Sequence, residues 1–124
     1  MKNILIFILV FSYFGLHANI EYIEVKQKSS YVELKIHKQN GSTHCCPKIY
    51  SGEYLGHNSE FYVVRKYGKG VAMGSIKLFN ERGEEQRHSI SIGNKAEVVV
   101  TNTIIIKEPK SSVAIYNFKG KRIK

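Results

Sequence analysis

Hydrophobic and polar residues alternate with a period of two along much of the chain. In segment 30–38, Val32, Leu34 and Ile36 are separated by charged and imidazole side chains, and segment 19–26 shows the same alternation. Successive side chains of a β-strand point to opposite faces of a sheet, so this pattern predicts half-buried strands. No stretch has a convincing helical period.

Further apolar runs, rich in β-branched and aromatic residues, predict more strands. These segments are 43–50, 60–67, 71–79, 87–92, 96–108 and 112–120. We expect segment 60–67 to bury one of its faces, and segment 96–108 to be either one bent strand or two short ones. The whole chain is predicted to hold roughly seven to nine antiparallel strands, spaced by about ten residues.

Glycine and proline mark the connections between these strands. Asn40-Gly41 is typical of a type I′ hairpin turn, in which both central residues need a positive φ. Gly83 is expected to adopt the left-handed conformation in the turn at 80–85. Pro47 has no N–H to donate, so its strand is expected at a sheet edge or at a bulge.

Short strands at this spacing predict an all-β fold, either an immunoglobulin-like or a jelly-roll β-sandwich. A small β-barrel is the alternative. The chain has no tryptophan and its two cysteines are adjacent, unlike the separated pair of a disulfide-bridged immunoglobulin domain. The aliphatic and aromatic core must therefore supply the stability.

The first 18 residues have the pattern of a secretory signal peptide. Lys2 precedes an apolar run from Ile4 to Leu16, and Ala18 is a small residue suited to the position before a cleavage site. A membrane span needs about 20 apolar residues, so this run is short for one. We expect a leader at 1–18, a single domain at 19–124, and a secreted or periplasmic product that is not an integral membrane protein after cleavage. An uncleaved N-terminal anchor is the alternative.

The charge is strongly positive. Without the leader, the chain has 18 lysines and arginines against 10 glutamates, which leaves +8, and it has no aspartate. A positive field favours anionic partners such as acidic protein surfaces, acidic glycans, anionic lipid or nucleic acid, although a basic surface also serves solubility alone. The densest basic stretch is 119–124, where a frayed terminus is the simpler interpretation.

Cys45 and Cys46 are the only cysteines. One thiol could be buried while the other is exposed and free to join two chains in a disulfide-linked dimer. The two could instead form a vicinal disulfide that acts as a redox switch. A soft metal held by His44, Cys45 and His57 is a third option, although metal sites are usually built from separated pairs such as CxxC. No cofactor is expected.

Catalytic motifs are scarce: the sequence has no HExxH, GxSxG or phosphate-binding loop. One enzymatic alternative is a small, basic, ribonuclease-like hydrolase. Glu60 would be its base, His88 its acid, and Arg65 or Arg87 would hold the phosphate. This hypothesis requires Glu60 and His88 to meet across one pocket.

Aromatic and basic residues are interleaved between positions 50 and 67, and basic residues recur in the C-terminal tail. Tyrosine with nearby cations suits a protein interface, a sugar or a single-stranded nucleic acid, although half of the rings could be core. The candidate binding residues are Tyr50, Tyr54, Tyr62, Arg65, Lys66, Tyr67, Lys119, Lys121 and Arg122.

These patterns favour an interaction protein over an enzyme, of the effector, inhibitor or immunity, or assembly-factor type. We expect a protein partner, with an anionic surface or a glycan as further candidates and nucleic acid still open. The edge near Pro47 and a free strand at 112–118 are candidate sites for strand addition by a partner. Asn40-Gly41-Ser42 is also an N-glycosylation sequon at an exposed turn.

Overall fold

The computed structural model describes residues 19–68 and 74–124, so the predicted leader lies outside the described residues. The described chain is all β and contains no helix, which confirms the predicted class of a small β-sandwich. Its strands are β1 (Ile20–Gln27), β2 (Tyr31–Lys38), β3 (Thr43–Tyr50), β4 (Gly52–His57), β5 (Phe61–Lys66), β6 (Gly74–Asn80), β7 (Ile90–Ile92), β8 (Glu97–Val100), β9 (Ile104–Lys107) and β10 (Val113–Tyr116).

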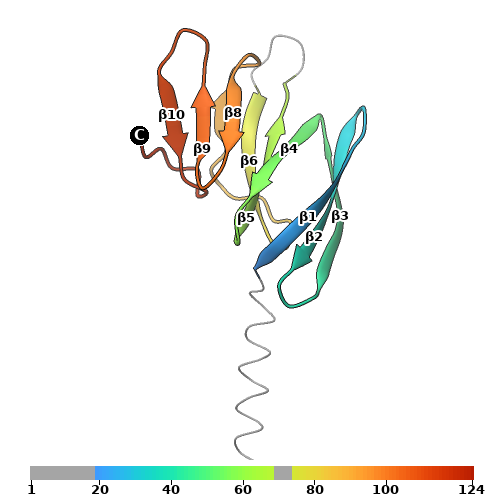
Figure 1. The fold of residues 1–124 in the computed structure, drawn as a ribbon. Helices are drawn as coiled ribbons and strands as arrows, with labels where there is room; N and C mark the ends of the chain where they lie inside the picture. Colours follow the sequence, from blue (N-terminus) through green and yellow to red (C-terminus); the bar gives the residue numbers. More distant parts are fainter. Residues whose placement is uncertain (1–18, 69–73) are drawn as a thin grey trace, which may run out of the picture.

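The strands form three antiparallel sheets (Figure 1). We call them the N-terminal sheet (β1-β2-β3), the middle sheet (β4-β5-β6-β7) and the C-terminal sheet (β10-β9-β8). Neighbours within each sheet are consecutive in the chain, so each sheet is a meander of hairpins. The Greek-key connections found in immunoglobulin and jelly-roll domains are not seen among the described strands.

The middle sheet is covered on both faces. Its strand β5 alternates between two cores: Val63 packs toward the C-terminal sheet, whereas Tyr62 and Val64 pack toward the N-terminal sheet. The first core consists of Val63, Ile76, Leu78, Ile90, Ile92, Ala96, Ile104, Ile106 and Phe118. The second consists of Ile20, Val32, Leu34, Ile36, Tyr62 and Val64. The expectation that segment 60–67 buries one face was therefore wrong, because sheets pack on both sides of it.

One strand was not predicted, and the alternative left open for segment 96–108 is decided in favour of two short strands. Strand β4 was not predicted, because glycines at both ends of its short GEYLGH segment weaken the strand pattern. The apolar segment 96–108 is two strands, β8 and β9, which form a hairpin closed by a hydrogen bond from Thr101 N to Thr103 O. The described chain thus has ten strands, one above the predicted range.

The β2–β3 turn is not of type I′. Gly41 has a φ of +86°, but Asn40 is not in the positive region. Lys38 O accepts from Gly41 N, and Lys38 N donates to Ser42 O, which is a three-residue loop that ends in a left-handed glycine. The Asn40 side chain stabilises this three-residue loop, because its Oδ1 accepts hydrogen bonds from Ser42 N and Ser42 Oγ.

Two other local predictions are confirmed. Gly83 is left-handed, with a φ of +80°. Pro47 lies on β3, which is an edge strand, and the register shift between Glu33 and Lys35 places Cys46 and Pro47 together opposite the single residue Leu34. This bulge removes the need for an N–H donor at Pro47.

Candidate functional site

A cavity of about 490 Å³ opens where the N-terminal and middle sheets meet. We call it the tyrosine cleft. Aromatic rings, hydroxyl groups and one carboxylate face it, and its lining residues are Gln27, Ser29, Ser30, Tyr31, Ser51, Gly52, Glu53, Tyr54 and Tyr67. Tyr50, 59% exposed, lies beside it with its ring centre 5.5 Å from that of Tyr31. The structure therefore gathers three of the predicted binding tyrosines, Tyr50, Tyr54 and Tyr67, around one cleft.

Cations lie near two of these rings. Lys48 Nζ is 5.2 Å from the centre of the Tyr31 ring, and the Arg65 guanidinium carbon is 4.8 Å from that of Tyr67. The Tyr67 hydroxyl donates a 2.5 Å hydrogen bond to Glu53 Oε2, and this bond together with desolvation raises the pKa of Tyr67. The Tyr67 ring is thus held by its hydroxyl hydrogen bond, which reduces the entropy cost of using it in a binding surface.

Tyr62 and Arg65 belong to the interior. Tyr62 is fully buried, stacks on Phe79 with ring centres 5.1 Å apart, and burial raises the pKa of its hydroxyl. Arg65 is 7% exposed and donates hydrogen bonds to the carbonyl oxygens of Ala96, Gly93 and Asn94 at 2.7–3.2 Å. Both were predicted to bind a partner, but neither is presented at the surface, because β5 is sandwiched between two sheets. Lys66, the next residue, is exposed.

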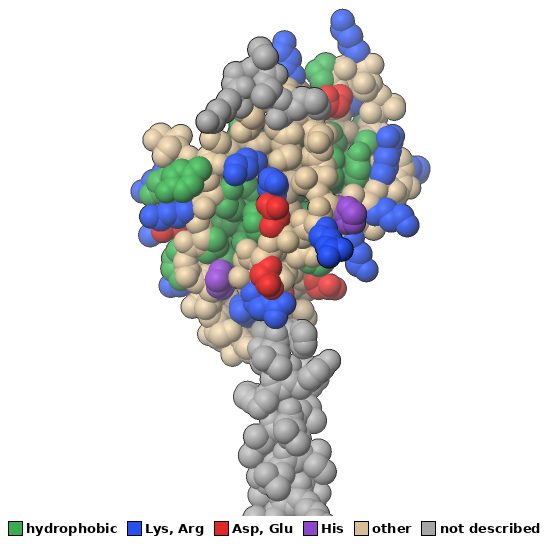
Figure 2. Space-filling view, turned by 180° about the vertical axis from the view of Figure 1, so that it is seen from behind, with side chains coloured by type: hydrophobic (Ala, Val, Ile, Leu, Met, Phe, Trp, Pro, Cys, Tyr) green, Lys and Arg blue, Asp and Glu red, His purple; other side chains and the backbone are tan. Residues whose placement is uncertain are grey.

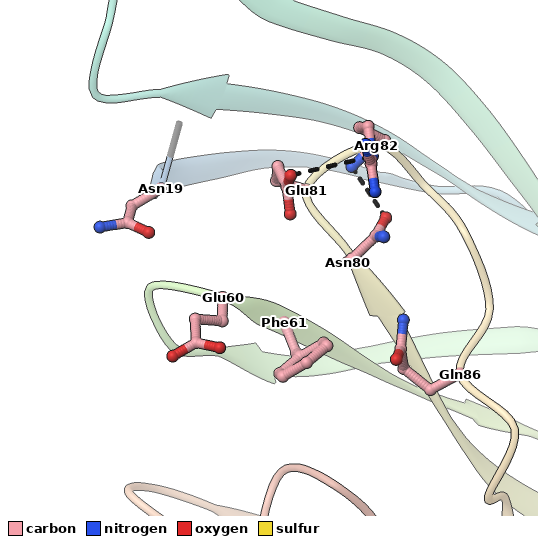
Figure 3. A pocket seen from close by; sticks show the side chains of 7 residues that line it. All are labelled: Asn19, Glu60, Phe61, Asn80, Glu81, Arg82 and Gln86. Atoms are coloured by element: carbon pink, nitrogen blue, oxygen red, sulfur yellow. Dashed lines mark hydrogen bonds and ion pairs between the residues drawn. The ribbon is translucent and has the colours of Figure 1, made fainter. Parts of the chain in front are cut away.

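The hydrolase constellation is not assembled. Glu60 lines a polar cavity of about 370 Å³ together with Asn19, Phe61, Asn80, Glu81, Arg82 and Gln86 (Figure 3). The cation in that cavity, Arg82, pairs with Glu84 at 2.8 Å. His88 instead lies beside Gly120, where an added Cβ would be 3.0 Å from the His88 Cβ. The cavity that Glu60 lines contains neither His88 nor Arg87.

The adjacent cysteines are bonded to one another, and the peptide bond between them is cis. This is the vicinal disulfide among the three options, and neither thiol is left free to join a second chain. The disulfide lies on the outer face of the N-terminal sheet, where a cavity of about 170 Å³ is lined by Glu24, Lys26, Glu33, Leu34, Lys35, Cys45 and Cys46. We call this the disulfide cavity.

The proposed metal ligands do not come together. Cys45 is part of the disulfide, and His57 Nδ1 is 2.7 Å from the Tyr54 hydroxyl. His44 lies elsewhere, with its Nε2 close to Gly83. Among residues 19–68 and 74–124, no three side chains of metal-binding type form a cluster.

A second surface, which sequence reasoning missed, crosses the outer face of the C-terminal sheet. Val99 pairs with Ile105, Ile105 with Ile115, and Ile115 exchanges backbone hydrogen bonds with Ile123 N and Lys124. We call these four residues the aliphatic row: Val99, Ile105, Ile115 and Ile123. Val99 is 55% exposed and Ile123 is 53% exposed. The sequence signal was the apolar runs of β8 and β9, where only alternate residues can enter the core.

The C-terminal tail completes this sheet. After a turn with Gly120 at a φ of +81°, Arg122 bridges to Tyr116, and Ile115 N donates to Lys124 O. The expectation of a free strand at 112–118 was therefore wrong, because the tail covers the outer edge of β10. The tail is also ordered rather than frayed, and its Lys119, Lys121 and Arg122 are exposed.

The face of the molecule turned away from the view of Figure 1 carries many protruding lysine and arginine side chains and fewer glutamates (Figure 2). The segment 93–124 contributes seven cations against two glutamates. None of those seven cations lies in an ion pair with a carboxylate within the part of the chain that the structure describes. Positive charge is thus concentrated around the C-terminal sheet.

No helix in the described residues is long and apolar enough to cross a membrane. Comparison of the chain with protein-family models, with curated proteins and with solved structures finds no match.

Proposed function

We propose that this chain is a secreted or periplasmic protein-binding module, and that it binds an acidic protein surface through the outer face of its C-terminal sheet. The observation that carries this proposal is the aliphatic row, an apolar strip across three strands and the tail that is exposed at Val99 and Ile123 and half-buried at Ile105 and Ile115. Soluble proteins rarely leave contiguous apolar surface in water, and such surface marks interaction sites.

The surroundings of the row resemble the anatomy of a protein interface. On one side lie the charged residues Glu97 and Lys107, which pair across the sheet in register, and the exposed Val113 extends the apolar surface beyond Lys107. On the other side lie the polar hairpin residues Thr101 and Thr103. An apolar centre with a polar rim is the arrangement found at protein interfaces, where the centre supplies affinity and the rim supplies orientation.

The excess of cations around this sheet favours a negatively charged partner. Seven lysines and arginines against two glutamates in segment 93–124 favour an acidic surface and speed its approach at low salt. We favour a protein over an anionic membrane because the row contains only valine and isoleucine. Membrane-surface anchors typically insert Trp, Phe or Leu.

The secreted or periplasmic location of the protein is part of the same proposal. The leader-like first 18 residues support export, and so does the intramolecular disulfide, because disulfides persist in oxidising compartments. No observation favours the hydrolase alternative, since its residues do not share a cavity.

The test is quantitative affinity capture from the extracellular or periplasmic fraction of the producing cell and of its neighbours. The immobilised chain is compared with a Val99→Glu/Ile123→Glu variant, and Val25→Glu serves as the matched control because Val25 is an exposed valine on the N-terminal sheet. We expect one acidic protein to bind the wild type and the Val25→Glu variant with similar affinity. Its affinity for the double variant should be at least tenfold lower, a difference of about 1.4 kcal/mol.

Two results would overturn the proposal. One is a partner whose affinity is the same for all three chains. The other is the absence of a protein partner together with binding to vesicles of phosphatidylglycerol and phosphatidylcholine that the double variant loses, which would assign the row to a membrane surface. Far-UV circular dichroism checks that each variant is folded.

A further inference from the structure

The middle sheet separates the disulfide cavity on the N-terminal sheet from the aliphatic row, and the chemistry of the cavity does not involve the row. Cys45 and Cys46 lie on β3, an edge strand, at the bulge opposite Leu34. Cys45 is exposed and Cys46 is half-buried. Structural disulfides are usually enclosed by the core, whereas exposed ones are the labile and reactive ones.

Two ammonium groups and two carboxylates line the same cavity. Lys35 is the cross-strand partner of Cys45, so the two side chains lie on the same face of the sheet, and Lys26 lines the cavity as well. Glu24, the other cross-strand neighbour of Lys35, is 2.7 Å from His37 Nε2. Lys35 forms no ion pair with a carboxylate among the described residues. Glu33 is the cross-strand partner of Lys26, so the lining as a whole carries no net charge. Lys35 is the cation paired across the strands with Cys45, where it stabilises a thiolate that forms beside it.

We propose that the Cys45–Cys46 disulfide is a thiol–disulfide exchange site, and that it captures a small thiol as a mixed disulfide. The exposed Cys45 Sγ is the atom attacked. A bond forms between the incoming sulfur and Cys45 Sγ, the Cys45–Cys46 bond breaks, and its electron pair stays on Cys46 Sγ as a thiolate.

The exchange is balanced and reversible. The first step consumes one thiolate and produces one thiolate, with no net oxidation. A second molecule of the thiol can attack the sulfur of the captured molecule. The protein then leaves as a dithiol, reduced by two electrons, and the two thiol molecules leave as their own disulfide. The thiol is thus the reductant of the full cycle, and the Cys45–Cys46 disulfide is the oxidant.

The volume of the cavity limits the class of thiol. About 170 Å³ accommodates a group of single-amino-acid size beside the sulfur atoms, which is enough for the part of a small thiol that carries its sulfur. Reduced glutathione is a suitable probe, because its cysteine carries the thiol and its two flanking residues can remain outside the cavity.

The first measurement is the state of the full chain as it is exported, by alkylation and intact mass without any reductant. We expect no alkylation, because both sulfur atoms are in the disulfide. Two alkylated thiols in the exported, folded protein would overturn the proposal.

The second measurement follows the reaction with reduced glutathione by acid quenching and mass spectrometry. We expect a mixed disulfide to form in the folded protein. Lys35→Gln should slow its formation about threefold, the effect of one unit charge at about 6 Å in water. Lys66→Gln is the matched control, because it removes the same charge from an exposed position on the middle sheet.

The Lys66→Gln control should react with glutathione at the wild-type rate. Equal rates for Lys35→Gln and the wild type would contradict the proposal that Lys35 stabilises the thiolate. Absence of any adduct in the folded chain, with reaction only after denaturation in urea, would overturn the proposal altogether. Neither result bears on the aliphatic row, so the two proposals fail separately.

Discussion

At the scale of single residues, Tyr62 and Tyr54 show how burial and hydrogen bonding separate two similar side chains. Tyr62 is fully buried and its hydroxyl has no hydrogen-bond partner in the described structure. The Tyr54 hydroxyl lies 2.7 Å from His57 Nδ1, and desolvation raises its pKa to about 12. A buried polar group without a hydrogen-bond partner lowers the free energy of unfolding, whereas a hydrogen-bonded one raises it. The two phenol groups therefore act in opposite directions.

We expect Tyr62→Phe to leave the free energy of unfolding unchanged or to raise it by about 1 kcal/mol, and Tyr54→Phe to lower it by about 1 kcal/mol. Urea unfolding near neutral pH measures both. Because the folded pKa of Tyr54 lies above the value of about 10 in the unfolded chain, the free energy of unfolding should also fall as pH rises from 10 to 12. A loss of stability in Tyr62→Phe as large as in Tyr54→Phe would contradict the assignment of an unsatisfied hydroxyl.

At the scale of the element, the C-terminal tail protects an edge. Strand β10 is the last strand of its sheet, and Ile115 directs its N–H and C=O to residues 123 and 124 of the tail. An unpaired edge strand is a template for pairing with another chain. We therefore expect deletion of residues 121–124 to cost about 1–3 kcal/mol of stability and to cause concentration-dependent self-association.

Equilibrium sedimentation and urea unfolding of the truncated chain test this expectation. The matched control is Lys121→Gln/Arg122→Gln, which removes charge but keeps the backbone pairing of the tail. The control should stay monomeric. If the control associates as strongly as the truncated chain, the tail acts through its charge and not through edge protection.

Sequence patterns predicted the elements better than their environment. Alternation located β1 and β2, and proline chemistry placed Pro47 at an edge and a bulge, because both depend on local geometry. The same patterns misplaced Arg65 and Tyr62 at a binding surface, because burial on both faces of β5 depends on residues of the two outer sheets, which are remote in the sequence. The aliphatic row was missed for the same reason, since its residues meet only through pairing of β8, β9, β10 and the tail.

At the scale of the whole molecule, the middle sheet makes one folding unit of three sheets. Val63 belongs to the core shared with the C-terminal sheet, and its neighbour Val64 to the core shared with the N-terminal sheet. Arg65 then ties the same strand to the carbonyl oxygens that precede β8. Because one strand contributes to both cores, neither outer sheet can detach without exposing apolar surface on β5.

We therefore expect Val63→Ala and Val64→Ala to lower the free energy of unfolding by similar amounts, about 2 kcal/mol each, within a single cooperative transition. The chain has eight tyrosines and no tryptophan, so tyrosine fluorescence and far-UV circular dichroism are independent probes of the same unfolding reaction. Coincident urea curves in both variants would mean that the sheets unfold together. A Val64→Ala variant whose fluorescence changes before its circular dichroism would mean that the N-terminal sheet, with its disulfide cavity, opens on its own while the C-terminal sheet and its aliphatic row stay folded.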